Sequence, residues 1–482
     1  MSNKVIMQFF EWYLPVDARH WNRLTKEAAY LAHLGITDVW MPPAYKGQAG
    51  LEDVGYGVYD LYDLGEFYQR GTIPTKYGTV EEYLHAIETL HSFGIRAIGD
   101  IVLNHRMGED YQEYVYTTRK DPVDRYIPIH EHKLVLAGTG FNFPGRKRKY
   151  SSFCWNKEHF TACDRNGIND QDGIFLFEGE KWEDEVDAEN GNYDYLMGAN
   201  VKFKSPEVSD ELCSWGRWYM DKAKLDGVRL DAVKHIPRSF FPRWLQTIRE
   251  HTHKEMFAVG EYWNGNPDTL TYYLDKIGHC MSLFDVALHY RLHQFAEAVN
   301  KNEPYDLRTI FDNTLVAREP EYAVTFVDNH DTQYEQPLES WVDDWFKPMA
   351  YALILLRDKG TPCVFYGDLY GIDYHGKKPV AELEPMLLAR RRFARGNQHE
   401  HFVNENVIGW SRDGGLAVLM SVAGEYTQPM YVAHPNQVFI DLTGNCKDEI
   451  RTNGDGWGDF KVNPRSVSVW VPKDKSDFNR KT

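Results

Sequence analysis

The sequence lacks the features of a membrane or secreted protein. No window holds about 18 uninterrupted apolar residues, which excludes a helical membrane span. The first residues, MSNKVIMQFFEWYLP, lack the basic start, the apolar stretch and the small-residue cleavage site of a secretory signal. The 6 cysteines are scattered, and none forms a CxxC pair or a cluster with histidine. These absences favour a reducing compartment, and we expect a cytoplasmic location.

The chain also has fewer basic than acidic residues. The chain has 54 Lys and Arg residues against 71 Asp and Glu residues, which gives a net charge of −17. Such a protein is poorly suited to bind nucleic acid or an anionic membrane, so we expect neither partner. Aromatic residues, in contrast, make up 14% of the chain. Sugar rings stack on aromatic side chains, but large cores use them too, and composition alone favours the core.

Alternating apolar runs and helical patterns predict the fold. Residues 21–34 have helical apolar spacing that stops at Gly35, a plain C-terminal cap, and Thr79 with Glu82 forms a capping box that opens a second helix. Eight apolar runs, each interpreted as a buried strand, alternate with helical stretches and predict a closed (β/α)8 TIM barrel. The runs are residues 5–10, 36–41, 95–103, 227–230, 256–260, 282–286, 323–327 and 363–366.

Two stretches fall outside this alternation. The interval after the third run is far longer than an ordinary connection, and we interpret residues 105–207 as an inserted domain of irregular β structure. Its basic cluster, Arg146 to Lys149, is interpreted as a solvated surface turn. From residue 397 to 482, short β-rich runs separated by Gly, Asn and Asp predict a C-terminal antiparallel β-sandwich. The barrel domain would then comprise residues 1–104 and 208–396.

Polar residues gather at the C-terminal ends of the predicted strands, where the active sites of such barrels lie. A single acidic residue at a strand end is usually a helix cap, but carboxylates and histidines from separate strands converge on one mouth. These residues are Asp100, Asn104 and His105 at the third run, Arg229 and Asp231 at the fourth, Glu261 at the fifth, and Asp328, Asn329, His330 and Asp331 at the seventh.

Paired carboxylates suit the cleavage of a glycosidic bond, because one must attack or stabilise the anomeric carbon and one must protonate the leaving oxygen. Asp231 and Arg229 share one side of a strand, and the arginine would keep Asp231 ionised, although a structural ion pair explains this pair equally well. Glu261 follows the apolar run FAVG, so burial should raise its pKa, as a general acid requires. Asp331 would bind sugar hydroxyls.

Four short motifs resemble the four sequence regions of the α-amylase family, glycoside hydrolase family 13, and occur in that family's order. They are DIVLNH from Asp100, GVRLDAVKH from Gly227, GEYW from Gly260 and FVDNHD from Phe326. The resemblance covers the chain up to the predicted C-terminal domain and is greatest to the bacterial liquefying-type α-amylases. It implies a retaining endo-hydrolase of α-1,4-glucosidic bonds in starch, glycogen or maltodextrins.

The resemblance also implies roles for individual residues. It makes Asp231 the nucleophile, Glu261 the general acid/base and Asp331 the stabiliser of the transition state. The positions that match the family's sugar-binding residues are Tyr56, His105, Arg229, Lys234, Trp263 and His330.

The family carries a structural calcium ion between barrel and insertion, so the resemblance implies one Ca²⁺. Calcium accepts amide and backbone oxygens as well as carboxylates, so a site survives where relatives commonly have Asp and this chain has Asn200, although the lost charge should weaken it. Lys202 and Lys204 nearby make a second metal unfavourable. The matching positions are Asn104, Asp194, Asn200 and the backbone carbonyl of His235. Without the resemblance, Asp194 would be interpreted as a turn cap.

Two alternatives stay open. A transglycosylating or maltooligosaccharide-forming enzyme of the same family would use the same residues, because sugar can replace water in intercepting a glycosyl-enzyme. A non-catalytic carbohydrate-binding protein on a decayed barrel would have lost a carboxylate, whereas Asp231, Glu261 and Asp331 are all present. We expect an α-glucan as the partner, and a monomer.

Overall fold

The computed structural model describes residues 3–476 of the chain. In that part, eight parallel strands close into a barrel in which each strand pairs with the next along the chain and the last pairs with the first. The strands are β1 (Ile6–Gln8), β2 (Asp38–Met41), β5 (Arg96–Ile101), β12 (Gly227–Leu230), β13 (Phe257–Gly260), β14 (Ser282–Phe284), β15 (Ala323–Phe326) and β16 (Thr361–Phe365). The predicted (β/α)8 barrel is therefore confirmed.

Helices surround the barrel and follow the sequence signals closely. Gly35 ends the first helix in the left-handed conformation (φ 89°), and Thr79 and Glu82 form the capping box of the second. The sixth strand is shorter than predicted because Asp285 caps the next helix, its side chain accepting from Leu288 N at 2.9 Å. The helices are α1 (His20–Leu34), α2 (Val80–Ser92), α3 (Pro206–Ala223), α4 (Phe240–Thr252), α5 (Pro267–Lys276), α6 (Val286–Lys301), α7 (Leu315–Arg318), α8 (Lys347–Leu355), α9 (Tyr366–Tyr370) and α10 (Leu383–Phe393).

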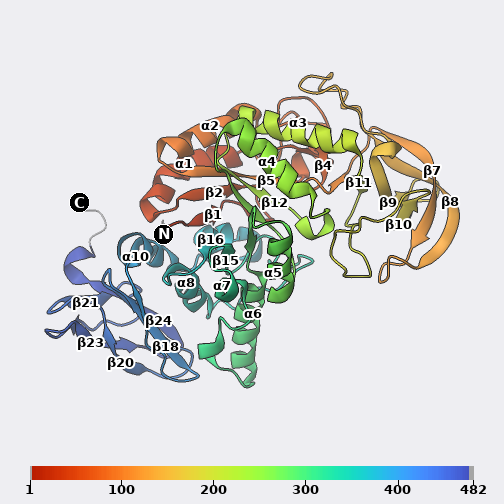
Figure 1. The fold of residues 1–482 in the computed structure, drawn as a ribbon. Helices are drawn as coiled ribbons and strands as arrows, with labels where there is room; N and C mark the ends of the chain where they lie inside the picture. Colours follow the sequence, from red (N-terminus) through yellow and green to blue (C-terminus); the bar gives the residue numbers. More distant parts are fainter. Residues whose placement is uncertain (1–2, 477–482) are drawn as a thin grey trace.

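The insertion between β5 and α3 is more regular than predicted. It forms a six-stranded sheet of antiparallel pairs in the order β6-β11-β9-β10-β7-β8, and a long hairpin of β7 and β8 lies at its edge. This sheet projects from one end of the molecule (Figure 1). Its strands lie inside the predicted range 105–207, whose limits stay a prediction. They are β6 (His105–Arg106), β7 (Tyr111–Lys120), β8 (Pro128–Gly140), β9 (Phe160–Asn166), β10 (Gln171–Phe177) and β11 (Ala199–Val201).

The C-terminal region forms a β-sandwich, as predicted. Its larger sheet has the order β17-β18-β19-β24-β21-β22 and its smaller sheet pairs β20 with β23, all antiparallel. A core of residues such as Met430, Phe460 and Trp470 lies between them. The strands are β17 (Gln398–Glu400), β18 (Val407–Arg412), β19 (Leu416–Ser421), β20 (Tyr426–Tyr431), β21 (Val438–Asp441), β22 (Ile450–Arg451), β23 (Trp457–Val462) and β24 (Ser466–Pro472).

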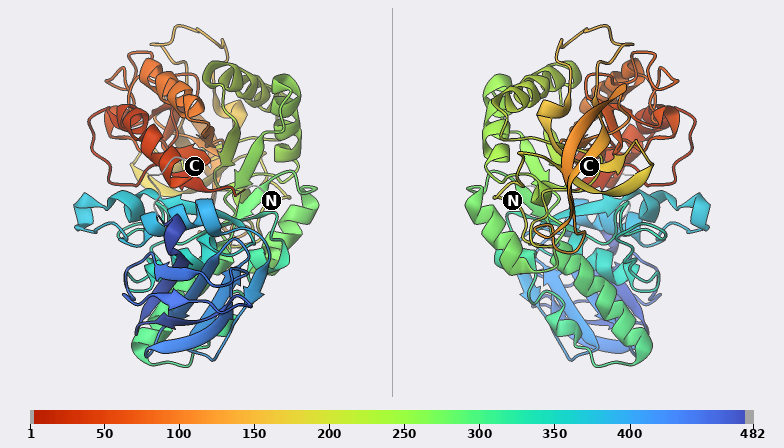
Figure 2. Two further views of the ribbon diagram at one scale, coloured as in Figure 1. Left: turned by 90° about the vertical axis from the view of Figure 1, so that its left-hand side faces the viewer. Right: turned by 90° about the vertical axis from the view of Figure 1, so that its right-hand side faces the viewer.

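The sandwich packs against the barrel on the side away from the insertion (Figures 1 and 2). All residues of β18 and β19 are buried, because one face of their sheet covers the barrel helices and the other faces the smaller sheet. Val418 and Val469 belong to the same apolar core as the barrel, in which β24 contacts α8 and α10. Apolar runs without alternation are the sequence signature of such doubly covered strands.

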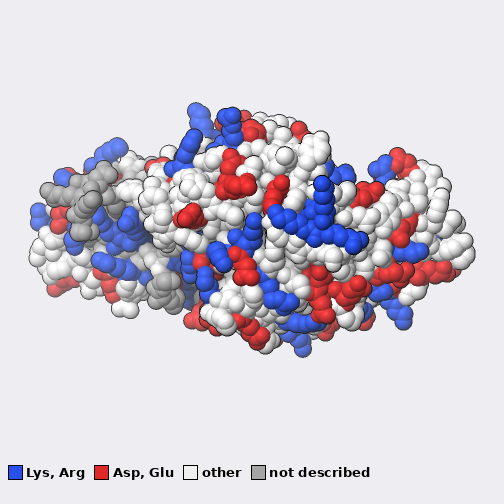
Figure 3. Space-filling model, turned by 90° about the horizontal axis from the view of Figure 1, so that it is seen from above, with Lys and Arg blue, Asp and Glu red and all other residues white. Residues whose placement is uncertain are grey.

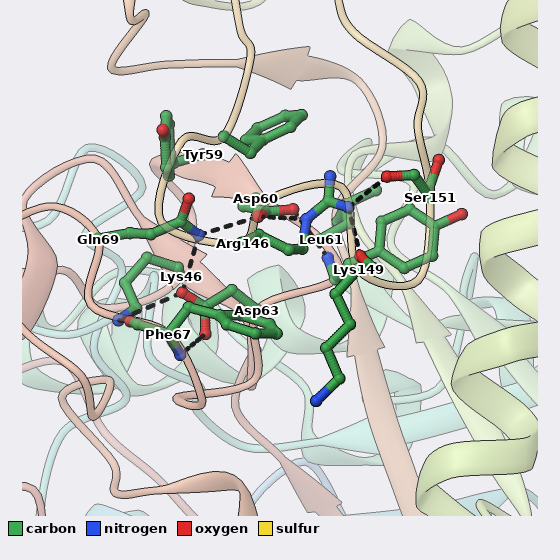
Figure 4. Close-up of polar contacts among 12 residues, drawn as sticks. Lys46, Tyr59, Asp60, Leu61, Asp63, Phe67, Gln69, Arg146, Lys149 and Ser151 are labelled. Atoms are coloured by element: carbon green, nitrogen blue, oxygen red, sulfur yellow. Dashed lines mark hydrogen bonds and ion pairs between the residues drawn. The ribbon is translucent and has the colours of Figure 1, made fainter.

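Lys147, Arg148 and Lys149 are exposed, as predicted for a solvated turn, but Arg146 is not. Its side chain is buried, and its Nε donates to Asp60 Oδ2 at 2.9 Å while its Nη1 donates to the carbonyls of Lys149 and Ser151 at 2.6 Å each. Asp60 belongs to the small hairpin of β3 (Lys46–Gly47) and β4 (Val58–Asp60). Figure 4 shows this buried network, which ties the insertion to the hairpin beside the barrel.

The charged side chains of the visible surface are mixed in sign. Acidic and basic side chains are interspersed on the face seen from above (Figure 3). Among the described residues, no helix combines the length and the apolar character needed to cross a membrane. The 6 cysteines lie within the described residues and are free thiols.

Candidate active site

Three neighbouring strands bring the central residues of the site together. Arg229 lies in β12 opposite Asp100 of β5, and Asp231 and Glu261 directly follow β12 and β13. All of these side chains lie at the C-terminal mouth of the barrel, where backbone ends leave room for a ligand. The predicted convergence of side chains from separate strands is therefore observed.

Arg229 binds three carboxylates at this mouth. Its Nη1 donates to Asp100 Oδ1 at 2.8 Å and to Asp231 Oδ1 at 2.6 Å, and its Nη2 donates to Glu261 Oε2. The arginine side chain is only 1% exposed, whereas those of Asp231 and Glu261 are 10% and 11% exposed. The buried Arg229 guanidinium thus binds two carboxyl groups, those of Asp231 and Glu261, that are still partly exposed at the mouth.

Glu261 has the electrostatics of a proton donor. Burial raises the pKa of its carboxyl well above the usual range, and the negative charges of Asp231 and Asp331 raise it further, although Arg229 opposes them. Ala232 N donates to its Oε2 at 3.3 Å. A carboxyl group with a raised pKa holds its proton at neutral pH and can deliver it to a leaving group.

Asp331 and His330 follow β15 and complete the cluster. Burial raises the pKa of Asp331 to about 7, with Asp231 adding to the effect. Gln8 Nε2 lies 3.0 Å from His330 Nδ1, so this amide donor leaves the ring proton on Nε2, which lies 3.3 Å from Asp331 Oδ2. Burial lowers the pKa of His330 well below its usual value, so the ring is a neutral donor.

An aromatic wall borders the carboxylates. The Tyr56 ring stacks on His330, with centroids 5.1 Å apart, and lies parallel to Trp12 at 6.0 Å. The Tyr56 hydroxyl donates to Asp100 Oδ2 at 3.0 Å, and its carbonyl lies 2.8 Å from His105 Nε2. Burial lowers the pKa of His105, which leaves this imidazole neutral. The wall offers a flat apolar face beside hydrogen-bonding groups, which suits a sugar ring.

Lys234 and Trp263 lie together on another side of the mouth. Lys234 Nζ donates to Glu189 Oε2 at 2.7 Å and to the Trp263 carbonyl at 3.2 Å. The Trp263 indole donates to the Tyr290 hydroxyl at 2.8 Å. Glu189 comes from the insertion, so this contact joins the insertion to the barrel mouth.

The positions predicted for calcium lie where β5 ends and the insertion begins. Val201 N donates to the Asn104 carbonyl at 3.0 Å, and β11, which carries Asn200, pairs with β6. His235 Nδ1 donates to the Tyr193 carbonyl at 2.6 Å, next to Asp194. The structure therefore brings all of the predicted ligand positions into one neighbourhood.

The side-chain chemistry of these positions fits a hard cation. The Oδ1 atoms of Asn104, Asp194 and Asn200 are buried and have no hydrogen-bond partner among residues 3–476. Buried oxygens are normally satisfied, and oxygens without donors are what calcium binds. No group of three His, Cys, Asp or Glu side chains within that range could hold a metal, so the set depends on its amides. Glu183 Oε1 is a further buried oxygen without a partner, which the sequence interpretation missed.

The lysines near this cluster already have anionic partners. Lys204 Nζ lies 3.0 Å from Glu183 Oε2, and Lys202 Nζ lies 2.5 Å from Glu180 Oε1. The positive charge of Lys204 lies beside Glu183, and it would repel a second metal ion at that carboxylate. The number of metal ions stays a prediction.

The structure also shows a buried hydrogen-bond network behind the loop that carries Asp331. Asp328 Oδ1 accepts from Thr332 Oγ1 at 2.8 Å, and Asn329 Oδ1 accepts from the backbone N of Asp331 at 2.9 Å. Lys347 Nζ lies 2.8 Å from Asp328 Oδ2 and also contacts Asp368. The buried Lys347 thus holds the loop that carries Asp331 through its ion pair with Asp328.

Sequence reasoning missed two members of the site. Trp12 stacks beside Tyr56, and Gln8 sets the tautomer of His330. Both lie in the stretch QFFEWY, residues 8–13, in which Gln8 ends β1 and Trp12 lies in the loop after it. QFFEWY resembles the α-amylase family, but neither residue type indicates chemistry by itself, so no role was assigned to either residue.

Carboxyl groups gathered at the mouth of a (β/α)8 barrel suit the cleavage of a glycosidic bond, as in glycoside hydrolases. The family model "Alpha amylase, catalytic domain" matches residues 20–414, and "Alpha-amylase C-terminal" matches residues 421–471. The chain therefore belongs to the α-amylase family.

Individual relatives agree with this assignment. The "Alpha-amylase" of Geobacillus stearothermophilus is 48% identical over 98% of this chain and 87% of its own length. The "Cytoplasmic alpha-amylase" of Escherichia coli (strain K12) is 42% identical over 98% of this chain and 99% of its own. An Anoxybacillus α-amylase structure, with a TM-score of 0.63, 15% identity and 98% coverage of both chains, shares the fold.

Proposed function

We propose that this α-amylase-family enzyme hydrolyses internal α-1,4-glucosidic bonds of starch, glycogen or maltodextrins with retention of the anomeric configuration. The observation that carries the proposal is the attachment of Asp231 and Glu261 to the two ends of the Arg229 guanidinium. Carboxyl groups held on one arginine lie near each other, as in retaining glycosidases, where the separation is about 5 Å.

In the first step, Asp231 attacks the anomeric carbon and forms a glycosyl-enzyme ester while the glycosidic C–O bond breaks. Glu261 gives its proton to the departing oxygen, so the new chain end leaves as a neutral hydroxyl. Arg229 donates a hydrogen bond to Asp231 Oδ1 and so fixes the direction of the attacking carboxylate. The raised pKa of Glu261 supports its role as the donor.

In the second step, the ionised Glu261 takes a proton from water, and the water oxygen attacks the same carbon and releases Asp231. Two inversions at this carbon restore the original configuration. Asp331 and the neutral Nε2–H of His330 hold hydroxyls of the reacting sugar, and Tyr56 stacks on its ring. Lys234 and Trp263 bind the sugar on the leaving-group side.

We further propose one calcium ion held by Asn104, Asp194, Asn200 and the backbone carbonyl of His235. When bound, the ion would neutralise Asp194 and pin the insertion to the barrel mouth. The unpartnered buried oxygens support this. Chelation should lower the melting temperature, and a ligand bound at about 1,000 times its dissociation constant adds about 4 kcal/mol to folding stability. Calorimetry with and without EDTA measures this, and Asn104→Ala should abolish the difference.

We propose the cytoplasm as the compartment, which the free thiols and the likeness to the Escherichia coli relative support. Cell fractionation of the native host tests this, and activity in the medium or periplasm would contradict it. The monomeric state and the absence of nucleic-acid and membrane partners stay predictions.

The hydrolytic function is tested by incubating the protein with a maltooligosaccharide series. Internal cleavage into shorter chains supports the proposal, and products longer than the substrate would indicate the transglycosylase alternative. Absence of any cleavage would indicate the non-catalytic alternative, in which the carboxylates only bind sugar.

A further inference from the structure

Two glutamine side chains join the loop after β1 to the loop after β15. Gln8, the last residue of β1, reaches His330, and Gln333 reaches back to Trp12. In the described barrel, β16 lies between β1 and β15, so the two strands are not neighbours and no backbone ladder joins them. Side chains therefore connect the two loops over the barrel mouth.

Gln333 uses both ends of its amide in this connection. Its Oε1 accepts from Trp12 N at 2.9 Å, and its Nε2 donates to Glu11 Oε2 at 3.1 Å. The same Glu11 oxygen accepts from Tyr13 N at 2.7 Å. Gln333 and Glu11 are buried, so the loss of a partner here is costly. The backbone of residues 11–13 is thus held by the Gln333 and Glu11 side chains.

The residue whose backbone is held in this way carries a ring of the active-site wall. The Trp12 side chain is half-buried, and its ring lies nearly parallel to the Tyr56 and His330 rings, with interplanar angles of 3° and 13°. Gln333 lies two residues after Asp331. One amide group therefore connects the position of an aromatic ring to the loop that carries His330 and Asp331.

Gln336 of the same loop offers a matched comparison. Its Nε2 donates to the Tyr13 hydroxyl at 2.9 Å, and that hydroxyl donates to the Tyr334 carbonyl at 2.8 Å. Loss of the Gln336 amide would leave the Tyr13 hydroxyl bonded to Tyr334 and the Trp12 backbone bonded to Gln333. The two glutamines thus bind the same neighbouring loop, but only the Gln333 amide binds the backbone of Trp12.

We propose that Gln333 is a positioning residue that sets the place of Trp12 against the loop carrying His330 and Asp331, so that the aromatic wall meets the sugar bound by these two residues. The inference rests on the proposed function, because that function supplies the sugar. Gln333 acts through Trp12 and takes no part in the chemistry. A stacked ring binds the sugar alike in the ground state and the transition state, so displacement of the ring should raise KM and leave kcat unchanged.

The test replaces Gln333 by methionine, which has a similar length and no amide. Gln333→Met should raise KM for maltoheptaose about tenfold, as expected for one lost hydrogen bond, at the parental kcat. A merely structural role would instead reduce the folded fraction, which lowers kcat and leaves KM unchanged. In a Trp12→Ala background, where the ring is already absent, Gln333→Met should change KM by less than about twofold. Gln336→Met should match the parent in both constants.

A second pair of variants tests the hydrogen bond to Trp12 N and also serves if Gln333→Met fails to fold. Gln333→Glu keeps an oxygen that can accept from Trp12 N, but it places a like charge against the Glu11 carboxylate, so KM should rise. Adding Glu11→Gln removes this repulsion and retains an acceptor for Tyr13 N. The double variant should therefore return KM most of the way to the parental value.

A parental KM for Gln333→Met would overturn the positioning role and leave the proposed function intact. Equal rises in KM from Gln333→Met with and without Trp12→Ala would overturn it too, because the effect would then not pass through the ring. A double variant with a KM as high as that of Gln333→Glu alone would contradict the role of the acceptor. A parent protein that fails to cleave maltoheptaose would instead overturn the proposed function.

Discussion

Two buried cations organise the barrel mouth, and their surroundings differ. Arg229 and Lys347 are each 1% exposed in the side chain and each bind carboxylates. The partners of Arg229 that follow the strands, Asp231 and Glu261, are 10% and 11% exposed, whereas Asp328, beside Lys347, is fully buried. The Lys347 amino group is also covered by the Trp341 ring, 3.1 Å from its centre.

The comparison separates a perturbed carboxyl from a reactive one. Burial raises the pKa of Asp328 and of Asp331 to about 7 in both cases. Only Asp331 faces the mouth, however, and only there can a sugar reach the group. A shifted pKa therefore indicates an unusual environment, and the opening to solvent decides whether that environment can do chemistry.

The largest expected effect comes from the partly exposed carboxyl groups around Arg229, which we call the open cluster. Glu261→Gln removes the proton donor and Asp231→Asn removes the nucleophile, so each should lower kcat on maltoheptaose by about 10³-fold or more. Steady-state kinetics measures this, and circular dichroism spectra should remain those of the parent. An active Asp231→Asn enzyme would contradict the roles assigned here.

Substitutions in the closed cluster, the fully buried carboxylates around Lys347, should lower the stability of the fold rather than the rate of the reaction. Lys347→Met leaves two buried carboxylates without their cation, and the free energy of unfolding should fall by about 3–5 kcal/mol. Urea unfolding measures the change. Adding Asp368→Asn should restore part of the loss, and Lys377→Met, which breaks a more exposed pair with Asp344, should cost less than about 1 kcal/mol. Equal losses for Lys347→Met and Lys377→Met would remove the distinction between the two lysines.

A further effect is expected on the pH dependence of folding stability, through Asp331 at the barrel mouth. The pKa of Asp331 rises from its ordinary 3.8 to about 7 in the folded protein, so the unfolded chain ionises this group first as pH increases. Its contribution to stability is therefore lost between about pH 4 and pH 7. Asp331→Asn should match the parent near pH 4 and exceed it by about 4 kcal/mol above pH 7.

Thermal unfolding across this pH range measures the Asp331 effect. Asp306→Asn is a matched control with the opposite sign, because Arg308 lowers the pKa of Asp306 by hydrogen bonding at the surface. A constant difference between Asp331→Asn and its parent from pH 4 to pH 8 would show that burial of this carboxyl carries no energetic cost.

The sequence predicted the barrel and its mouth well for a physical reason. Parallel strands covered on both faces read as unbroken apolar runs, and the polar residue that ends each run marks the mouth, as with Asp231 and Glu261. Arg146 was misjudged because its partner Asp60 lies 86 residues earlier in the chain. Lys347 was hidden at the start of an apolar helix, and Trp12 lies in a loop with no periodic pattern.

The central claim is that Asp231 and Glu261 act as nucleophile and acid/base on one α-glucan bond. Proton NMR of the first products released from maltoheptaose tests it most directly, with Glu261→Gln run beside the parent. The account predicts α-anomeric products from internal cleavage by the parent and no products from the variant. Products released as β-anomers would mean direct attack by water, and Asp231 would then have no role as a nucleophile.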